Sequence, residues 1–223
     1  MTGSRRRAPR QAEAERNDRA LLQAARDVLA LEGSHASVAA IAARAGVGIG
    51  SLYRRYRSKE ELFQRLSLLS LEHWNEAAER GLAAADPWDG LVGFITSCVE
   101  FGQGTLAPIA GTIEITEEMA ARSAQGDALL ATLVARARAA GVLRPDVTAV
   151  DVSLLIEQLG GSPVLDQLRR QGRDDLIDAA TRARNRLIAI CLDGLRTGGA
   201  VRPLPGPAPT DELFDERWVR GPS

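Results

Sequence analysis

The sequence predicts an all-α protein in which a three-helix N-terminal domain precedes a larger helical bundle. Hydrophobic residues form 45% of the 223 residues and aromatic residues only 4%, while alanine, leucine and arginine recur throughout; this composition favours helices. In one segment after another, apolar residues return every three or four positions, which is the period of an amphipathic helix. The chain is also long enough for a small domain and a larger one.

Charge divides the chain into two unlike parts. The whole chain has a net charge of −1, but the part through Arg65 holds 13 Lys and Arg against 7 Asp and Glu, and the remainder holds 15 against 22. A basic segment joined to an acidic one is typical of proteins that bind phosphates with one end. We therefore expect any nucleic acid to bind the N-terminal part.

The chain begins with a predicted basic arm, residues 1–15, which contains four arginines and no apolar periodicity. Such an arm is either a solvated tail or a segment that follows phosphates or enters a minor groove. The first helix begins near Asn17 and ends at Gly33. Its apolar stripe consists of Leu21, Ala24, Ala25, Val28 and Leu29.

Two short helices follow. The first has an apolar stripe from Val38 to Ala45, with Ser37 suited to cap its start and Gly46 to end it in a left-handed conformation. The second begins near Gly48 and carries Leu52 inward. Two short helices joined by a glycine turn have helix-turn-helix geometry, in which the second helix lies in the major groove of DNA.

The third helix is predicted from the sequence Ser58-Lys59-Glu60-Glu61. It matches the S-x-x-E capping box, in which the serine accepts the third backbone N–H and the glutamate reaches back to the cap. The helix therefore begins at Lys59. Acidic residues are preferred in a first turn, so a lysine there indicates an external anion, and a DNA phosphate is suited to that role.

These residues carry a family resemblance. Ile41-Ala42, Ala45-Gly46-Val47-Gly48, Leu52-Tyr53, Tyr56 and the residues from Ser58 to Leu62 make the segment from about Asn17 to Leu66 similar to the DNA-binding domain of TetR-family regulators. Tyr56 stands where the family often has phenylalanine. The resemblance implies a C-terminal helical bundle for ligand binding and dimerisation.

DNA contact is accordingly expected from one set of residues in the predicted domain. The set is Ser37, Gly48, Ser51, Tyr53, Arg54, Arg55 and Lys59. Tyr53 and Lys59 match the family's phosphate-contacting positions, and Ser37 is expected on a phosphate as well. Base contact by Ser51 or Arg54 follows from their place on the second helix, whose start at Gly48 to Gly50 carries few polar groups.

The remaining helices are predicted from stripes and breakers. The helix from Lys59 runs into the body and stops before Asp86-Pro87. Further helices are expected at 91–101, at 129–141, from the Thr148–Asp151 capping box to Gly160, and at 174–196, with one or two short helices between 107 and 121. We divide the chain into the arm (1–15), the head (16–64), the body (65–198) and a Pro-rich tail (199–223).

Two surfaces of the body are assigned from the resemblance and the apolar stripes. A two-fold dimer is expected through the last two long helices, with Leu155, Leu159, Leu187 and Cys191 at the interface. A small hydrophobic ligand is expected on the segments that line the pocket in TetR-like proteins, at Trp74, Phe94, Cys98, Phe101, Glu114 and Met119. The competing interpretation of both sets is ordinary internal packing.

Other classes of protein have little support. Only His35 and His73 are available as imidazole bases, and Cys98 and Cys191 lack metal-ligand spacing, so we expect no enzyme, metal or cofactor. No apolar window suits a membrane span and no secretory signal is visible, so we expect no membrane partner and a cytoplasmic location. Three hypotheses remain: a homodimeric repressor released from double-stranded operator DNA by a hydrophobic ligand, a helical DNA binder without that input, and an all-helical enzyme or adaptor.

Overall fold

The computed structural model describes residues 20–29, 31–198 and 202–210, so the predicted arm and most of the tail lie outside the described residues. Over the described ranges the chain forms helices and no strand, apart from one isolated bridge between Leu143 and Arg196. The all-α prediction is confirmed. After a first helix over 20–29, the elements are η1 (Gly33–His35), α2 (Val38–Ala45), α3 (Ile49–Arg55), α4 (Lys59–Ala83), α5 (Pro87–Phe101), η2 (Ala107–Ile109), α6 (Glu117–Ala139), α7 (Ala149–Gly160), α8 (Pro163–Arg170), η3 (Asp174–Leu176) and α9 (Ile177–Leu195).

From Ser37 to Lys59 the helices of the head begin and end where the sequence predicts, whereas the predicted start of the first helix at Asn17 lies outside the described residues. Ser37 Oγ accepts from the backbone N–H of Ala40 at 3.0 Å, and Gly46 ends α2 with φ 69°, a conformation that costs glycine little. At the start of α4, Ser58 Oγ accepts from Glu61 N at 3.0 Å. The second half of that predicted capping box is wrong, because the Glu61 carboxylate accepts instead from Arg57 N at 2.6 Å, one residue before the cap.

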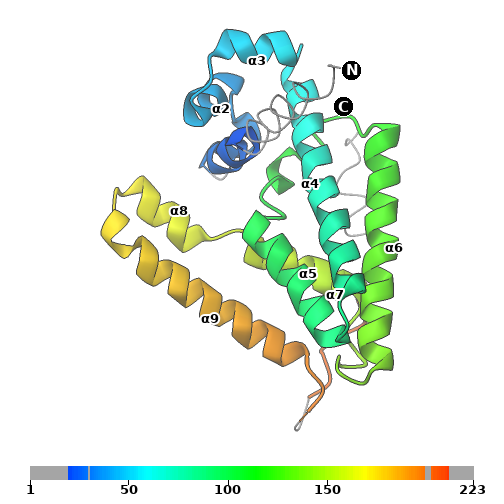
Figure 1. Ribbon diagram of the computed structural model, residues 1–223. Coiled ribbons are helices and arrows are strands. Elements are labelled where there is room, and N and C mark those ends of the chain that lie inside the picture. Colours follow the sequence, from blue (N-terminus) through cyan, green and yellow to red (C-terminus); the bar gives the residue numbers. More distant parts are fainter. Residues whose placement is uncertain (1–19, 30, 199–201, 211–223) are drawn as a thin grey trace, which may run out of the picture.

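A single long helix joins the head to the body. The 25 residues of α4 begin in the head and continue between α5 and α6, which both pack along it (Figure 1). The close crossing of α4 and α5 requires glycine, since a Cβ on Gly90 would lie 2.3 Å from the carbonyl oxygen of Gly81. Any movement of α4 within the body is therefore also a movement of its first turn in the head.

The middle of the body differs from the prediction. The helix expected from Leu129 begins at Glu117, twelve residues earlier, and passes through Gly126. That glycine does not break α6, because it lies at a contact with α4 where a Cβ would approach Asn75 Oδ1 and Trp74 Cδ1 to 2.6 and 2.7 Å. The 107–121 segment holds only the short η2 before α6, and a separate α8 follows the predicted Gly160 break.

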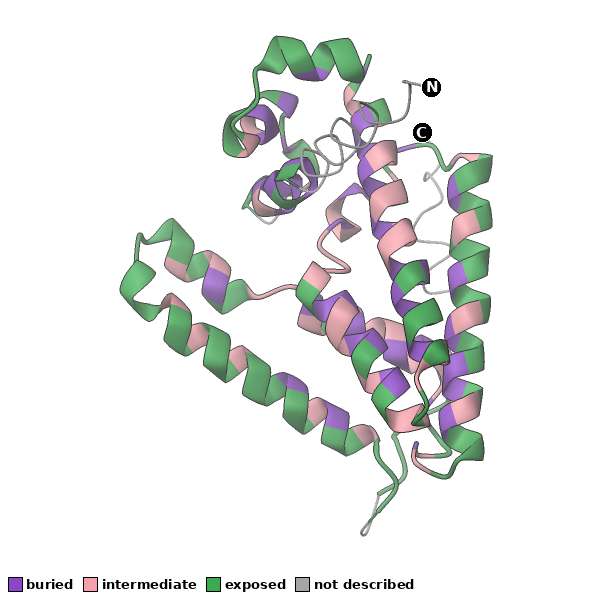
Figure 2. Cartoon of the chain, viewed as in Figure 1, coloured by how far each residue is buried: buried purple, intermediate pink, exposed green. Residues whose placement is uncertain are grey.

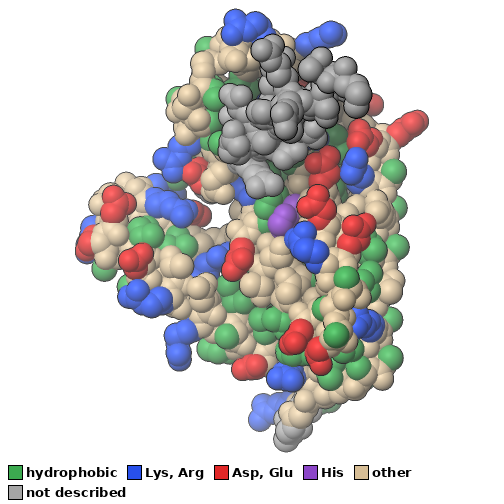
Figure 3. All heavy atoms as spheres, in the orientation of Figure 1, with side chains coloured by type: hydrophobic (Ala, Val, Ile, Leu, Met, Phe, Trp, Pro, Cys, Tyr) green, Lys and Arg blue, Asp and Glu red, His purple; other side chains and the backbone are tan. Residues whose placement is uncertain are grey.

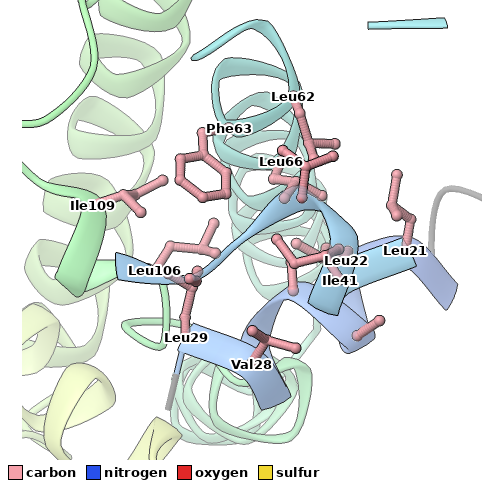
Figure 4. Packing of buried hydrophobic residues seen from close by; sticks show 14 of the residues in the cluster. Leu21, Leu22, Val28, Leu29, Ile41, Leu62, Phe63, Leu66, Leu106 and Ile109 are labelled. Carbon is pink, nitrogen blue, oxygen red and sulfur yellow. The ribbon is translucent and has the colours of Figure 1, made fainter. Parts of the chain in front are cut away.

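The buried hydrophobic residues of the described ranges form two clusters, and the first is shared between head and body. It joins the 20–29 helix, α2, α3 and the start of α4 to residues 106–119 of the body. Figure 4 shows Phe63 of α4 beside Ile109 of η2, and Leu106 beside Leu29. Figure 2 shows the second cluster as the buried faces of α4, α5, α6 and α7 that meet lower in the body. The head is therefore supported by the η2 segment as well as by α4.

The α8–α9 pair extends from the body as a hairpin (Figure 1). One face of α9 rests on the body through Ile188 and Leu192, which are 7% and 8% exposed, whereas Leu187 and Ile190 on the other face are 59% and 61% exposed. None of the helices in the described ranges has the length and hydrophobicity that a membrane crossing requires.

Candidate nucleic-acid interface

The outer face of α3 is fixed by one buried side chain. Leu52 is 4% exposed within the head core, and Tyr56, which follows the helix, is 6% exposed. These two anchors set the rotation of α3, so Ser51, Tyr53, Arg54 and Arg55 all lie exposed. The predicted DNA-contacting residues of α3 thus share the outer side of a helix whose position is fixed.

The start of α3 is open. Gly48 is the N-cap without a side-chain bond, and a Cβ added at Gly48 or Gly50 would meet nothing within 4 Å. Ile49 is 45% exposed beside this opening. Sequence reasoning did not single out Ile49, although its four-residue spacing from Tyr53 places both on one side of α3. An exposed apolar residue there is suited to contact a thymine methyl group.

Ser37 and Lys59 are the predicted phosphate donors outside α3. Ser37 Oγ already accepts the Ala40 N–H, so its hydroxyl hydrogen is the group that can be donated to a phosphate. Lys59 Nζ donates to the Ser34 carbonyl at 3.1 Å and lies 5.2 Å from the Phe63 ring centroid. These contacts hold the ammonium beside η1, and an ammonium has three N–H donors to distribute.

Charge is gathered at the same end of the molecule. Figure 3 shows Lys and Arg side chains projecting at the end formed by α3. Behind α3, Arg44 Nη2 of α2 pairs with Asp27 Oδ2 of the first helix at 2.6 Å, which ties two supporting helices together. Arg44 therefore has a partner within the head, while Arg54 lies on the exposed side of α3.

The six pocket candidates lie in three different places. Trp74, Phe94 and Cys98 meet in the second cluster, where the Trp74 and Phe94 rings form an edge contact at 4.9 Å and burial raises the pKa of the Cys98 thiol. Met119 belongs to the shared first cluster instead.

The other two candidates lie at the boundary between head and body. Glu114 is exposed, and its backbone N–H and carbonyl bond to Glu60 and Gln64 at 2.8 and 2.9 Å. Phe101 is half-buried and stacks on His73.

The dimer candidates also differ in exposure. Leu187 is 59% exposed, whereas Leu155, Leu159 and Cys191 are half-buried. Two residues that sequence reasoning missed, Ile190 on α9 and Val164 on α8, are each 61% exposed. Among the described residues, no three metal-ligating side chains come together as a metal site would require.

Family models match both parts of the chain. The model for bacterial regulatory proteins of the tetR family matches residues 21–66, and the model for the C-terminal domain of SbtR-like transcriptional regulators matches residues 86–197. The chain belongs to the TetR family. It is thus a TetR-family transcriptional regulator, a helical DNA-binding protein and not an enzyme, as the sequence predicts. None of the curated proteins compared with it matches.

Solved structures of TetR regulators share the fold. One from Mycobacterium vanbaalenii is 26% identical with a TM-score of 0.53, covering 84% of this chain and 99% of that one. One from Streptomyces coelicolor is 22% identical with a TM-score of 0.53, covering 82% and 99%. The ketosteroid transcriptional regulator of Mycobacterium tuberculosis is 22% identical with a TM-score of 0.50, covering 80% and 94%.

Proposed function

We propose that this TetR-family regulator binds operator DNA as a homodimer through the outer face of α3. The observation that carries the proposal is the exposure of Ser51, Tyr53 and Arg54 on a helix anchored by buried Leu52. Arg54 and Ser51 face base edges, while Tyr53, Arg55, Lys59, Ser37 and the Gly48 backbone meet phosphates. This division follows the general rule that phosphate contacts position a protein and base contacts specify the sequence.

The sequence predicts a dimer through α7 and α9; we place its interface on α9 and α8 instead, because Leu155 and Leu159 of α7 are half-buried whereas α9 has a second apolar face. Leu187 and Ile190 are large, exposed and three residues apart on one side of the helix, and Val164 on α8 adds a third exposed apolar side chain to the hairpin. Contiguous exposed apolar surface is typical of an interface. A pair of heads also supplies the contacts that one helix-turn-helix lacks.

The proposed regulation is repression relieved by a small hydrophobic ligand. Trp74 of α4 and Phe94 and Cys98 of α5 are the apolar side chains that such a ligand would contact. A ligand that favours one position of α4 changes the separation of the two heads, and only a difference in its affinity for the two positions shifts DNA binding. Couplings of this kind are typically about 1–3 kcal/mol, or about 5- to 150-fold in affinity. Acting on chromosomal DNA, such a repressor works in the cytoplasm.

A DNA binder without small-molecule input is the second candidate. It is favoured by the close packing around Trp74, where Phe94 and Cys98 are each 0% exposed and the two rings touch edge to face. A ligand in this place has to displace side chains that already fill the interior. Thermal-shift screening with hydrophobic compounds, followed by titration of hits into the operator complex, separates the two candidates. Compounds that stabilise the protein but leave its DNA affinity unchanged favour the DNA binder without small-molecule input.

Footprinting on DNA flanking the protein's own gene tests the proposed operator binding, because regulators of this kind often bind there. The expected result is a protected pseudo-palindrome whose protection is lost with Arg54→Ala. If no duplex is protected at micromolar protein, the proposal is wrong.

A further inference from the structure

The last turn of α5 and the residues after it join four other elements. We call residues 99–104 the α5 end. Gly102 closes the helix with φ 76°, and Gly104, with φ 89°, turns the chain against α7. Because these two positions carry no side chain, the segment can pass close to its neighbours.

The head reaches the α5 end through one arginine. Arg26, on the 20–29 helix, donates from Nη1 to the carbonyl of Phe101, and its Cζ lies 4.0 Å from the centroid of the Phe101 ring. The His73 ring of α4 lies 3.7 Å from the same centroid, tilted by 5°. Two groups this near one centroid occupy opposite faces, so Phe101 is held between a side chain of the head and one of α4.

The body reaches the same segment from α4, α7 and α9. Ser70 of α4 donates to Gln103 Oε1 at 2.8 Å. The end of α7 packs closely against the backbone of the α5 end, since a Cβ on Gly160 would lie 1.9 Å from Gln103 O. From α9, Arg184 Nη2 donates to Val99 O at 3.0 Å and to Leu159 O at 2.8 Å, so one guanidinium ties α9 to the ends of both α5 and α7.

Burial of Arg26 has both a free-energy cost and a free-energy gain. The residue is 6% exposed, and its Nε and Nη2 meet no acceptor among the described residues. Loss of hydration lowers the pKa of this guanidinium to about 10, against the opposing effect of Asp27. A desolvated cation gains from an aromatic face and a carbonyl but is penalised for each unmet donor. If Phe101 shifts, Arg26 loses its carbonyl and aromatic partners and regains water, so the contact depends on the position of the α5 end.

We propose that Arg26 is a positioning residue for operator binding: it holds the head on the α5 end, through which changes in α7 and α9 reach the head. This inference rests on the proposed operator binding and dimerisation. It adds a route from body to head beside the continuous helix α4 and the contacts of the η2 segment. Because coupling between two sites is reciprocal, DNA on the head also stabilises the α5 end.

The test compares the operator affinity of the wild-type protein with that of Arg26→Met, Phe101→Leu and the double variant. The duplex is the one recovered by footprinting. Arg26→Met keeps an apolar stem of similar length but removes the charge. We expect about tenfold weaker binding for each single variant, within the range of known couplings. The losses should be less than additive in the double variant, because both changes remove the contact between the Arg26 guanidinium and the Phe101 ring. Arg26→Lys, which retains a cation, should restore part of the loss.

Two measurements distinguish a positioning role of Arg26 from direct contact with DNA. A residue that touches phosphate lowers the salt dependence by about one counterion, whereas Arg26→Met should leave the slope unchanged. The matched control is Arg136→Met, which removes a guanidinium bound to the carbonyls of Leu82 and Ala85 inside the body. If this control loses as much thermal stability as Arg26→Met, it should still retain operator affinity within about twofold, since the carbonyls that Arg136 binds lie in the body.

Hydrogen exchange with and without the duplex provides the second readout. In the wild-type protein, DNA should slow exchange of amides in α5 and α7, and Arg26→Met should lose that protection while still binding DNA. Three results would each overturn this inference and leave the proposed function standing. They are equal affinity of the wild-type protein and Arg26→Met, additive losses in the double variant, and retained protection in Arg26→Met. A wild-type protein that binds no duplex overturns the proposed function and this inference with it.

Discussion

The helices α3 and α9 are built alike but present opposite chemistry to their surroundings. Each has one face fixed by buried leucine or isoleucine, Leu52 on α3 and Ile188 with Leu192 on α9. The outward face of α3 carries Ser51, Tyr53 and two arginines, whereas that of α9 carries Leu187 and Ile190. The inward face of a helix determines where it lies, and the outward face determines what it can bind. In the proposed function, a polyanion binds α3 and a second apolar surface binds α9.

The largest effect is expected from breaking the outward face of α9. Leu187→Asp with Ile190→Asp places two carboxylates where the partner's apolar side chains are expected, and desolvated, unpaired charges are costly. The protein should become monomeric and lose operator affinity by at least about 100-fold, because each head then binds alone. Sedimentation velocity and anisotropy titration measure both changes.

The control for this variant is Asn185→Asp, a single added charge at an exposed position on a different side of α9. It should remain dimeric. A wild-type protein that sediments as a monomer at micromolar concentration would remove the basis for comparing α3 with α9.

A smaller effect is expected from Arg54→Ala on the outward face of α3. A lost bidentate base contact typically costs about 1–3 kcal/mol, which corresponds to about 5- to 150-fold in affinity for the operator. Discrimination should fall at one base pair of each half-site, while affinity for unrelated duplexes changes little. Binding-site selection with both proteins measures this; an unchanged preference would assign Arg54 to a solvated surface.

Lys59→Ala should have a smaller and less specific effect. A phosphate contact carries no sequence information, so affinity should fall alike for all duplexes and the salt slope should decrease by about one counterion. Titrations at several salt concentrations measure the slope. Because Lys59 Nζ also bonds to the Ser34 carbonyl, thermal melting of the variant is needed as a control. Affinity and slope equal to those of the wild-type protein would contradict the phosphate assignment.

The smallest effect concerns pH at the junction of head and body. Burial lowers the pKa of His73 below its ordinary 6.5; the Ser97 carbonyl and Glu76 oppose this, and Arg80 and Arg26 add to it. Below about pH 6.5 the unfolded chain therefore binds more protons than the folded one, so folding stability falls as the pH decreases through that value. His73→Gln should lose this component. Denaturant midpoints between pH 7.5 and 5.5 measure it, and a constant difference between the two proteins would count against it.

Local signals predicted the head well because its geometry is set by local bonds. Ser37, Gly46 and Ser58 are caps whose partners lie within a few residues, and Leu52 fixes the phase of α3. These are interactions that spacing alone specifies. Even the error at Glu61 is a displacement of one residue, from the cap to Arg57 N.

The body could be predicted less completely because its decisive contacts are distant in sequence. The sequence predicts a helix only from residue 129, yet α6 begins at Glu117 and passes through Gly126, where Trp74 approaches it. The outward exposure of Ile190 depends on how α9 is placed on the body, which its own periodicity does not specify. The contact of Arg26 with Phe101 spans 75 residues and follows no motif. Tertiary packing decides such positions.

The most direct test of operator binding by a pair of α3 helices is hydroxyl-radical footprinting of the protected duplex. Two heads in a two-fold dimer should protect two half-sites on one face of the DNA, with centres about 34–36 Å apart or a multiple of that distance. Leu187→Asp with Ile190→Asp should abolish both protected regions together. A single protected region that survives in this variant would contradict the account.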